Sequence, residues 1–209
     1  MGIAAKGRRE RKEERKNFPP HHSFFAFFVF FCGSTTPVLA QRPAEVEKFL
    51  AAAQAQIGKT LTYDPAYTVL AYPGGDVPIE RGVCSDVVIR AFRGTGLDLQ
   101  KEIHEDMKRA FSAYPRNWDL KKPDANIDHR RVLNLMAFLK RRGKSLPVSQ
   151  NAADYQPGDL VTCIVPPHLP HIMIVSDPAR RLVIHNIGQG AREEDRLFEF
   201  EITGHYRWW

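Results

Sequence analysis

Hydrophobic residues in the first half of the chain recur at helical spacing. Apolar positions in residues 43–57 fall on one face, and Gly58 is placed to end that helix. After Cys84, the apolar residues Val87, Val88, Ala91 and Phe92 form a second stripe, which predicts a helix that begins at the cysteine. The same spacing predicts helices over residues 98–111 and 126–143, with Asn126 or Asp128 capping the last one.

The period of the pattern changes in the last third of the chain. β-Branched runs predict strands over residues 159–165, 171–175 and 182–187, the last two joined by a hairpin. Edge strands are predicted over 197–202 and 206–209, and a short strand over 68–71 within a Tyr-, Pro- and Gly-rich loop. Helices followed by an antiparallel meander indicate an α+β domain.

The N-terminal segment has the pattern of an export signal. Charged residues from Lys6 to Lys16 precede the apolar run Phe24–Cys32, and small residues follow as far as Ala40. This order is typical of a secretory signal peptide, with cleavage predicted after Ala40 and an uncleaved anchor as the alternative. We therefore expect a signal peptide over 1–40, a single domain over 41–209, and a periplasmic or secreted protein with no membrane span after cleavage.

Charge and cysteine content narrow the class of protein. Seven Lys or Arg against three Glu in residues 1–40 supply +4 of the formal net charge of +6. The predicted mature domain is thus close to neutral, which gives no reason to expect nucleic-acid binding. Cys84 and Cys163 would be its only cysteines, too few for a disulfide scaffold. Whether they form one bridge is left open by the sequence.

Cys84 is the candidate nucleophile. Unpaired N–H groups and the helix dipole at a helix start favour the thiolate, which is the form that attacks a carbonyl carbon. The alternative is a small buried core residue that packs one turn below Val87 and Val88.

Two histidines of the predicted hairpin can supply the remaining chemistry. A turn centred near Pro178 places His171 opposite His185, on one face of the sheet. His171 would then take the thiol proton and return it to the leaving amine, and His185, or Asn186 in another register, would orient it. Backbone N–H groups at the start of the Cys84 helix could hold the oxyanion.

These landmarks resemble two families. The segments 82–88, 157–161, 171–175 and 184–185 resemble, in order, NlpC/P60 peptidases, which are papain-like bacterial domains that cut peptidoglycan stem peptides with a Cys-His-His set. The segments 72–78, 104–107, 126–131 and 185–188 are similar to the DUF1287 family of secreted bacterial domains of unknown function, over most of residues 45–207. The resemblance implies a papain-like core in which the Cys-bearing helix packs on an antiparallel sheet. It also implies that Cys84 is the nucleophile, His171 the base and His185 the orienting residue.

The chain departs from the peptidase pattern beside the cysteine. The peptidases have Asp-Cys-Ser-Gly, whereas this chain has Val83 and Asp86 in the outer positions, and Tyr63 and Tyr72 both compete for the tyrosine near the groove. We expect a cysteine hydrolase that needs no cofactor and cleaves an amide bond, most plausibly in peptidoglycan stem peptides. The alternatives are acyl transfer on the same scaffold, or a non-catalytic domain that binds cell wall or holds zinc through Cys84, His171, His185 and His168. Candidate substrate-binding residues are Tyr63, Tyr72, Asp76, Ser85, Asp86, His129 and Asn186, and a grip of His129 and Arg130 on an anionic group is a further interpretation.

Overall fold

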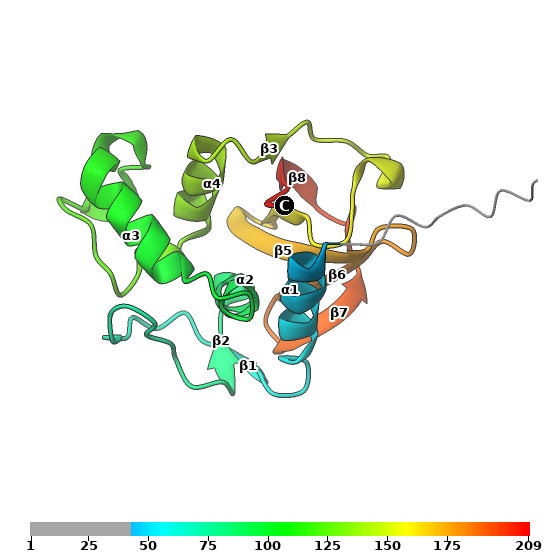
Figure 1. The fold of residues 1–209 in the computed structure, drawn as a ribbon, viewed down its shortest axis with the longest axis horizontal. Helices are drawn as coiled ribbons and strands as arrows, with labels where there is room; N and C mark the ends of the chain where they lie inside the picture. Colours follow the sequence, from blue (N-terminus) through cyan, green and yellow to red (C-terminus); the bar gives the residue numbers. More distant parts are fainter. Residues whose placement is uncertain (1–42) are drawn as a thin grey trace, which may run out of the picture. The chain divides into compact units, whose positions relative to one another are not determined.

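The computed structural model describes residues 43–209. The predicted signal peptide lies outside the described residues. Helix α2 (Cys84–Arg93) is the central element of the described part and packs against both α1 (Ala44–Gln54) and the sheet (Figure 1). Its stripe from Val87 to Phe92 is fully buried, as the hydrophobic spacing predicts.

All four predicted helices are confirmed. Besides α1 and α2, these are α3 (Leu99–Ala110) and α4 (Val132–Arg141). The predicted cap of the last helix is wrong, because a 3-10 turn at Asp128–Arg130 precedes it and Arg131 is its N-cap residue. The Asp128 carboxylate instead accepts hydrogen bonds from the Asp124 N–H and from His104. Three more 3-10 turns lie at Phe111–Ala113, Asn117–Asp119 and Ala152–Asp154.

A six-stranded antiparallel sheet makes up the second layer. Its strands stand in the order β3 (Ser145–Leu146), β8 (Glu201–Tyr206), β4 (Leu160–Val165), β5 (Leu169–Asp177), β6 (Leu182–Asn186) and β7 (Ala191–Asp195). The three central strands agree with the prediction. The predicted edge strands at 197–202 and 206–209 are displaced, because Trp208 and Trp209 pack on the rings of Phe92 and Phe138 rather than extending the sheet. The molecule is thus a mixed α+β fold.

The loop before α2 forms a small sheet of its own. Strands β1 (Thr62–Tyr63) and β2 (Arg81–Gly82) pair in parallel just before Cys84. The strand predicted over 68–71 is wrong. There the Leu70 N–H donates to the Asn126 side chain and the Ala71 carbonyl accepts from Gln100, so side chains satisfy this backbone without a strand partner.

Alternating side chains of the sheet belong to two hydrophobic clusters, one on each face. Ile172, Ile174 and Ile184 belong to the cluster that contains Cys84 and the buried faces of the helices. The opposite face carries a second cluster that includes Cys163, Met173, Val175 and Val183. Within the described residues, no helix is both long and apolar enough to cross a membrane.

Candidate active site

The start of α2 is held by a buried ion pair. Cys84 is the first residue of the helix, and the Val83 N–H donates to the Asp86 carboxylate over 2.7 Å. Arg130 binds both oxygens of that carboxylate at 3.0 Å, and the Ser85 hydroxyl donates to the Arg130 carbonyl over 2.7 Å. Ser85 and Asp86, predicted to contact substrate, therefore have their polar groups engaged in fixing Cys84.

Cys84 lies in the wall of a cavity of about 190 Å³. Its thiol contacts the Tyr63 hydroxyl and the backbone N–H groups of Ser85 and Ile172. Of the two candidate tyrosines, Tyr63 thus lies at the cavity, whereas Tyr72 donates to Glu105 over 2.7 Å; a substrate contact from either stays a prediction. The other lining residues are mostly apolar, with one aromatic and one basic side chain: Pro65, Val83, Trp118, Ile127, Arg130, Val132, Leu133 and Pro170.

Burial determines the ionisation of this thiol. Removal from water raises the pKa of Cys84 to about 11, and the nearby Asp86 carboxylate adds to this effect. The N–H groups of Ile172 and Ser85 and the Tyr63 hydroxyl favour the thiolate but do not offset burial. The thiolate expected from the helix start is therefore not the resting form, and Cys84 rests as a neutral thiol.

His171 and His185 are brought together by the sheet. His171 Nε2 lies 2.8 Å from His185 Nδ1. The register differs from the predicted one by two residues, since Ile174 pairs with Ile184 and Val175 with Val183. A shift of two residues keeps a side chain on the same face, whereas a shift of one would not. The predicted proximity of the two histidines survives for this reason.

Glu194 of β7 completes a polar chain. His185 Nε2 lies 3.1 Å from the Glu194 carboxylate, which can only accept while ionised. His185 must therefore donate from Nε2 and accept at Nδ1, so that neutral His171 donates from Nε2. This assignment leaves Nδ1 of His171 unprotonated and able to accept a proton. Burial, with a smaller effect of His185, lowers the pKa of His171 to about 3 and keeps this imidazole neutral.

The thiol and this imidazole meet strand β5 at neighbouring residues but on different faces. The Cys84 thiol contacts the N–H of Ile172, the residue that follows His171 in β5. Strand alternation gives His171 the face of Met173, while Ile172 packs with Cys84. No hydrogen bond joins Cys84 and His171 among residues 43–209. The structure thus assembles two pairs, Cys84 with Tyr63 and His171 with His185.

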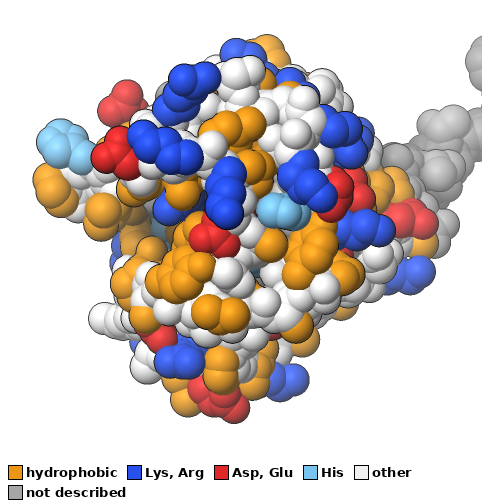
Figure 2. All heavy atoms as spheres, turned by 90° about the vertical axis from the view of Figure 1, so that its left-hand side faces the viewer, with side chains coloured by type: hydrophobic (Ala, Val, Ile, Leu, Met, Phe, Trp, Pro, Cys, Tyr) orange, Lys and Arg blue, Asp and Glu red, His pale blue; other side chains and the backbone are white. Residues whose placement is uncertain are grey.

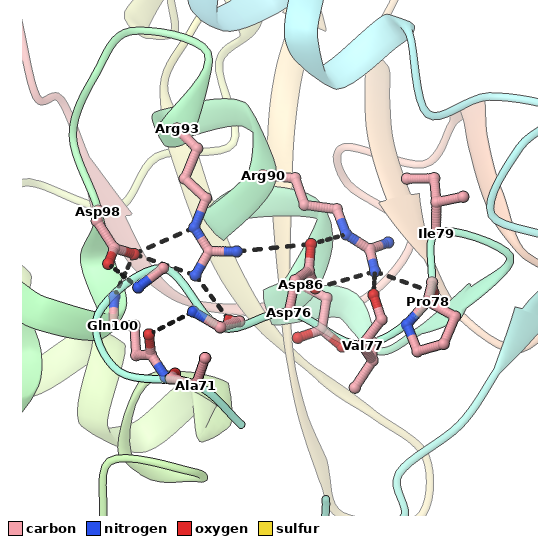
Figure 3. A network of polar contacts seen from close by, with 12 residues as sticks. Ala71, Asp76, Val77, Pro78, Ile79, Asp86, Arg90, Arg93, Asp98 and Gln100 are labelled. Carbon is pink, nitrogen blue, oxygen red and sulfur yellow. Dashed lines mark hydrogen bonds and ion pairs between the residues drawn. The ribbon is translucent and has the colours of Figure 1, made fainter. Parts of the chain in front are cut away.

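The remaining predicted binding residues are engaged elsewhere. Asp76 binds the Arg90 guanidinium through both oxygens, at 2.8 and 3.1 Å (Figure 3). Asn186 donates to the carbonyls of Gly82 and Thr62, which ties β6 to the short strands before Cys84. His129 is buried, and burial lowers its pKa to about 3. A substrate contact from any of these residues stays a prediction.

Neither a disulfide nor a metal site occurs at this location. Cys84 and Cys163 are both free and buried. In the part of the chain that the structure describes, no three His, Cys, Asp or Glu side chains are arranged to hold a metal ion. The zinc alternative therefore has no ligand set within these residues.

Three residues at or beside the site were missed by sequence reasoning. Glu194 lies in the charged run 192–195, whose side chains are mostly exposed, as on any edge strand. Trp118, which lines the cavity, lies in an irregular loop without periodicity, and Arg131, which stacks on Trp118, is one of two adjacent arginines that the sequence cannot distinguish. Of the three, only Glu194 could have been found from the sequence, because the run Ala191–Asp195 follows the predicted hairpin closely enough to form a neighbouring strand.

Comparison with known proteins identifies the family. Residues 50–208 match the domain of unknown function DUF1287. The chain belongs to the DUF1287 family. It is also 55% identical over 177 residues to the uncharacterized protein YijF of Escherichia coli (strain K12), an alignment that covers 82% of this chain and 86% of that protein. This membership agrees with the resemblance read from the sequence motifs of the DUF1287 chain.

Proposed function

We propose that this DUF1287 domain is an exported cysteine hydrolase that cleaves an amide bond, with a papain-like arrangement of the NlpC/P60 type. Cys84 is the nucleophile, His171 the base and then the acid, and His185 the orienting residue. The observation that carries the proposal is the position of the Cys84 thiol. It lies at the first residue of a helix, in the wall of a cavity, against the backbone next to a histidine whose tautomer is fixed.

The proposed reaction starts from neutral partners. The Cys84 proton moves to Nδ1 of His171 while sulfur bonds to the carbonyl carbon, and the carbonyl becomes an oxyanion. The N–H groups of Ser85 and Ile172, which already contact the sulfur, are the nearest donors for that oxyanion. His171 then protonates the leaving amine as the C–N bond breaks, which leaves a thioester on Cys84. Water attacks the thioester, His171 takes its proton, and the acid leaves as the thiol is restored.

Substrate binding has to bring the thiol and the imidazole within hydrogen-bonding distance. Catalytic hydrogen bonds are often long in the free enzyme and form only when substrate excludes water. The chain His171–His185–Glu194 supports this step, because the Glu194 carboxylate stabilises positive charge that develops on the two imidazoles. This stabilisation has to offset the burial of His171, which disfavours the protonated imidazole and keeps its pKa low.

Peptidoglycan stem peptides are the proposed substrate. The export signal predicted over residues 1–40 would deliver the domain to the compartment of the cell wall. The small, mainly apolar cavity fits a short amino-acid side chain better than a nucleotide or a sugar chain. On the α3 side of the molecule, lysine and arginine side chains are separated by hydrophobic and acidic ones, without the continuous basic band of a nucleic-acid site (Figure 2).

Two cysteine variants test this proposal. Purified protein is incubated with peptidoglycan and with free muropeptides, and the products are read by mass spectrometry. Cys84→Ser should lose about a thousandfold or more in rate, because a serine hydroxyl is a far weaker nucleophile without a strong base. Cys163→Ser is the matched control, since Cys163 is equally buried but does not line the cavity, and it should retain cleavage. Cleavage that persists in Cys84→Ser, or no cleavage by the folded wild type, would contradict the proposal. A product that carries a new acyl group in place of a free acid would assign acyl transfer instead.

A non-catalytic wall-binding domain is the second candidate. Cys84 is only 3% exposed and its pKa is raised, as is common for a cysteine that serves packing alone. A sedimentation assay distinguishes this role, since a binding domain would associate with intact peptidoglycan equally well as wild type and as Cys84→Ser while releasing no fragments.

A further inference from the structure

Trp118 forms the outer wall of the Cys84 cavity in an unusual conformation. Its side chain is 51% exposed, and it lines the same cavity as the Cys84 thiol. The φ angles of Trp118 and Asp119 are +66° and +54°, in the left-handed region that bulky side chains rarely adopt. A residue held in this region is strained, and strain of this kind is concentrated at binding and catalytic sites. An exposed aromatic ring held in this conformation beside a cavity indicates a ligand contact.

Arg131 lies on the face of this ring. Its guanidinium carbon is 4.2 Å from the centre of the Trp118 ring. Nη1 of Arg131 is buried and has no hydrogen-bond partner among the described residues. A buried guanidinium N–H without an acceptor is unfavourable. Arg131 does not itself line the Cys84 cavity, so an acceptor group has to enter beside the Trp118 ring to reach the guanidinium.

The neighbouring arginine is fully occupied by contrast. Arg130 binds both oxygens of Asp86 and the carbonyls of Asp64 and Ala66. Its role is therefore to hold the start of α2, and the anion grip that the sequence suggested for Arg130 falls instead to Arg131. Asp124 and Asp128 act on Arg131 through space, but neither forms an ion pair with it in residues 43–209.

We propose that Trp118 and Arg131 bind the free terminal carboxylate of a peptide whose last residue occupies the Cys84 cavity. This inference rests on the proposed function and specifies its substrate class. The planar guanidinium matches a carboxylate through two parallel hydrogen bonds, and the apolar cavity wall suits a short aliphatic side chain such as that of alanine. The scissile bond would then be close to the carboxyl end of the peptide.

A binding measurement in a Cys84→Ala background tests the inference without hydrolysis. The probes are an acetylated tripeptide that ends in alanine, as free acid and as carboxamide, in both the L and the D configuration at the last residue. Affinity is read by calorimetry or by NMR titration. We expect one of the two acids to bind at least about tenfold tighter than its amide, because the amide loses the charge-assisted hydrogen bonds.

Arginine variants assign that preference to a residue. Arg131→Gln should reduce the acid-to-amide ratio to about one. The control is Arg142→Gln, since Arg142 also stacks on a ring, at 4.9 Å from Phe138, but pairs with Glu102 away from the cavity. The control should keep the ratio of the parent protein.

The outcomes separate this inference from the proposed function. Equal binding of acid and amide, no binding up to millimolar concentration, or a ratio that persists in Arg131→Gln would overturn the carboxylate site. Hydrolysis of muropeptides without preference for a free carboxylate would retain the hydrolase and reject the site. A carboxylate preference in a protein that hydrolyses nothing would retain the site and reject the hydrolase.

Discussion

The two ends of helix α2 differ in how completely their polar groups are satisfied. Toward its C-terminus, Arg90 donates to Asp76, to the Thr60 hydroxyl and to three backbone carbonyls, and Arg93 binds Asp98 and the Gly75 carbonyl (Figure 3). At its N-terminus, Ser85 and Asp86 are engaged with Arg130, but the Cys84 thiol lines a cavity. Beside the Trp118 ring of that cavity, Nη1 of Arg131 lacks a protein partner among the described residues.

This difference separates structural from functional polar groups. Saturated networks fix the backbone, here by holding the 72–78 loop on α2, and leave no capacity for a ligand. Groups left incomplete beside a cavity cost stability unless a ligand or a reaction uses them. The motif residue Asp76 belongs to the first kind, and Arg131 to the second.

The largest expected effect is on stability at the saturated end. Arg90→Leu should lower the free energy of unfolding by about 3 kcal/mol, because Asp76 and several carbonyl acceptors lose their donor. Denaturant unfolding measures this loss. The rate of hydrolysis per folded molecule should stay close to that of wild type, since Arg90 does not line the cavity. An Arg90→Leu variant that is as stable as wild type but inactive would show that Arg90 serves the reaction and not the fold.

Acid should destabilise the protein by a smaller amount. The pKa values of His171 and His129 are lowered to about 3 by burial, whereas both residues titrate near 6.5 when unfolded. The unfolded state therefore binds more protons between these values, and the free energy of unfolding falls as pH falls through this window. We expect a loss of about 2 kcal/mol between pH 6.5 and 5.5, about 1 kcal/mol from each histidine, measured by denaturant unfolding at each pH. Stability that is constant over this range would show that these imidazoles do not stay neutral in the fold.

Removal of Glu194 should have the smallest effect. Glu194→Gln should reduce the rate of hydrolysis about tenfold, or about 1.4 kcal/mol in the barrier, since the amide can still orient His185 but carries no charge. Loss of the carboxylate also lowers the pKa of His185, so the acid limb of the pH–rate profile should move to lower pH. Glu193→Gln on the same strand is the control and should leave the profile unchanged. An unshifted profile in Glu194→Gln would exclude Glu194 from the relay.

Local patterns allowed the helices, the central strands and the histidine pair to be predicted. The stripe from Val87 to Phe92 and the β-branched strands depend only on periodicity, which tertiary contacts did not override. The proximity of His171 and His185 survived an incorrect register because the shift was even. The strand predicted over residues 68–71 is absent because long-range hydrogen bonds with the side chains of Asn126 and Gln100 take the place of a strand partner.

The rest of the site depends on the assembled fold. Glu194 reaches His185 only because β7 pairs with β6, and Tyr63 reaches Cys84 through the short β1–β2 ladder. The prediction of a thiolate at Cys84 is wrong because burial raises the pKa of this thiol by more than the helix start lowers it.

Trapping of the acyl-enzyme is the most direct test of Cys84 as the nucleophile. Protein mixed with muropeptides is quenched in acid within one turnover, digested, and mapped by mass spectrometry for a thioester. The account predicts an adduct on the Cys84 peptide, with the mass of the acyl half of the cleaved product, that appears before free acid is released. An adduct on Cys163, or cleavage that proceeds without any adduct on Cys84, would contradict it.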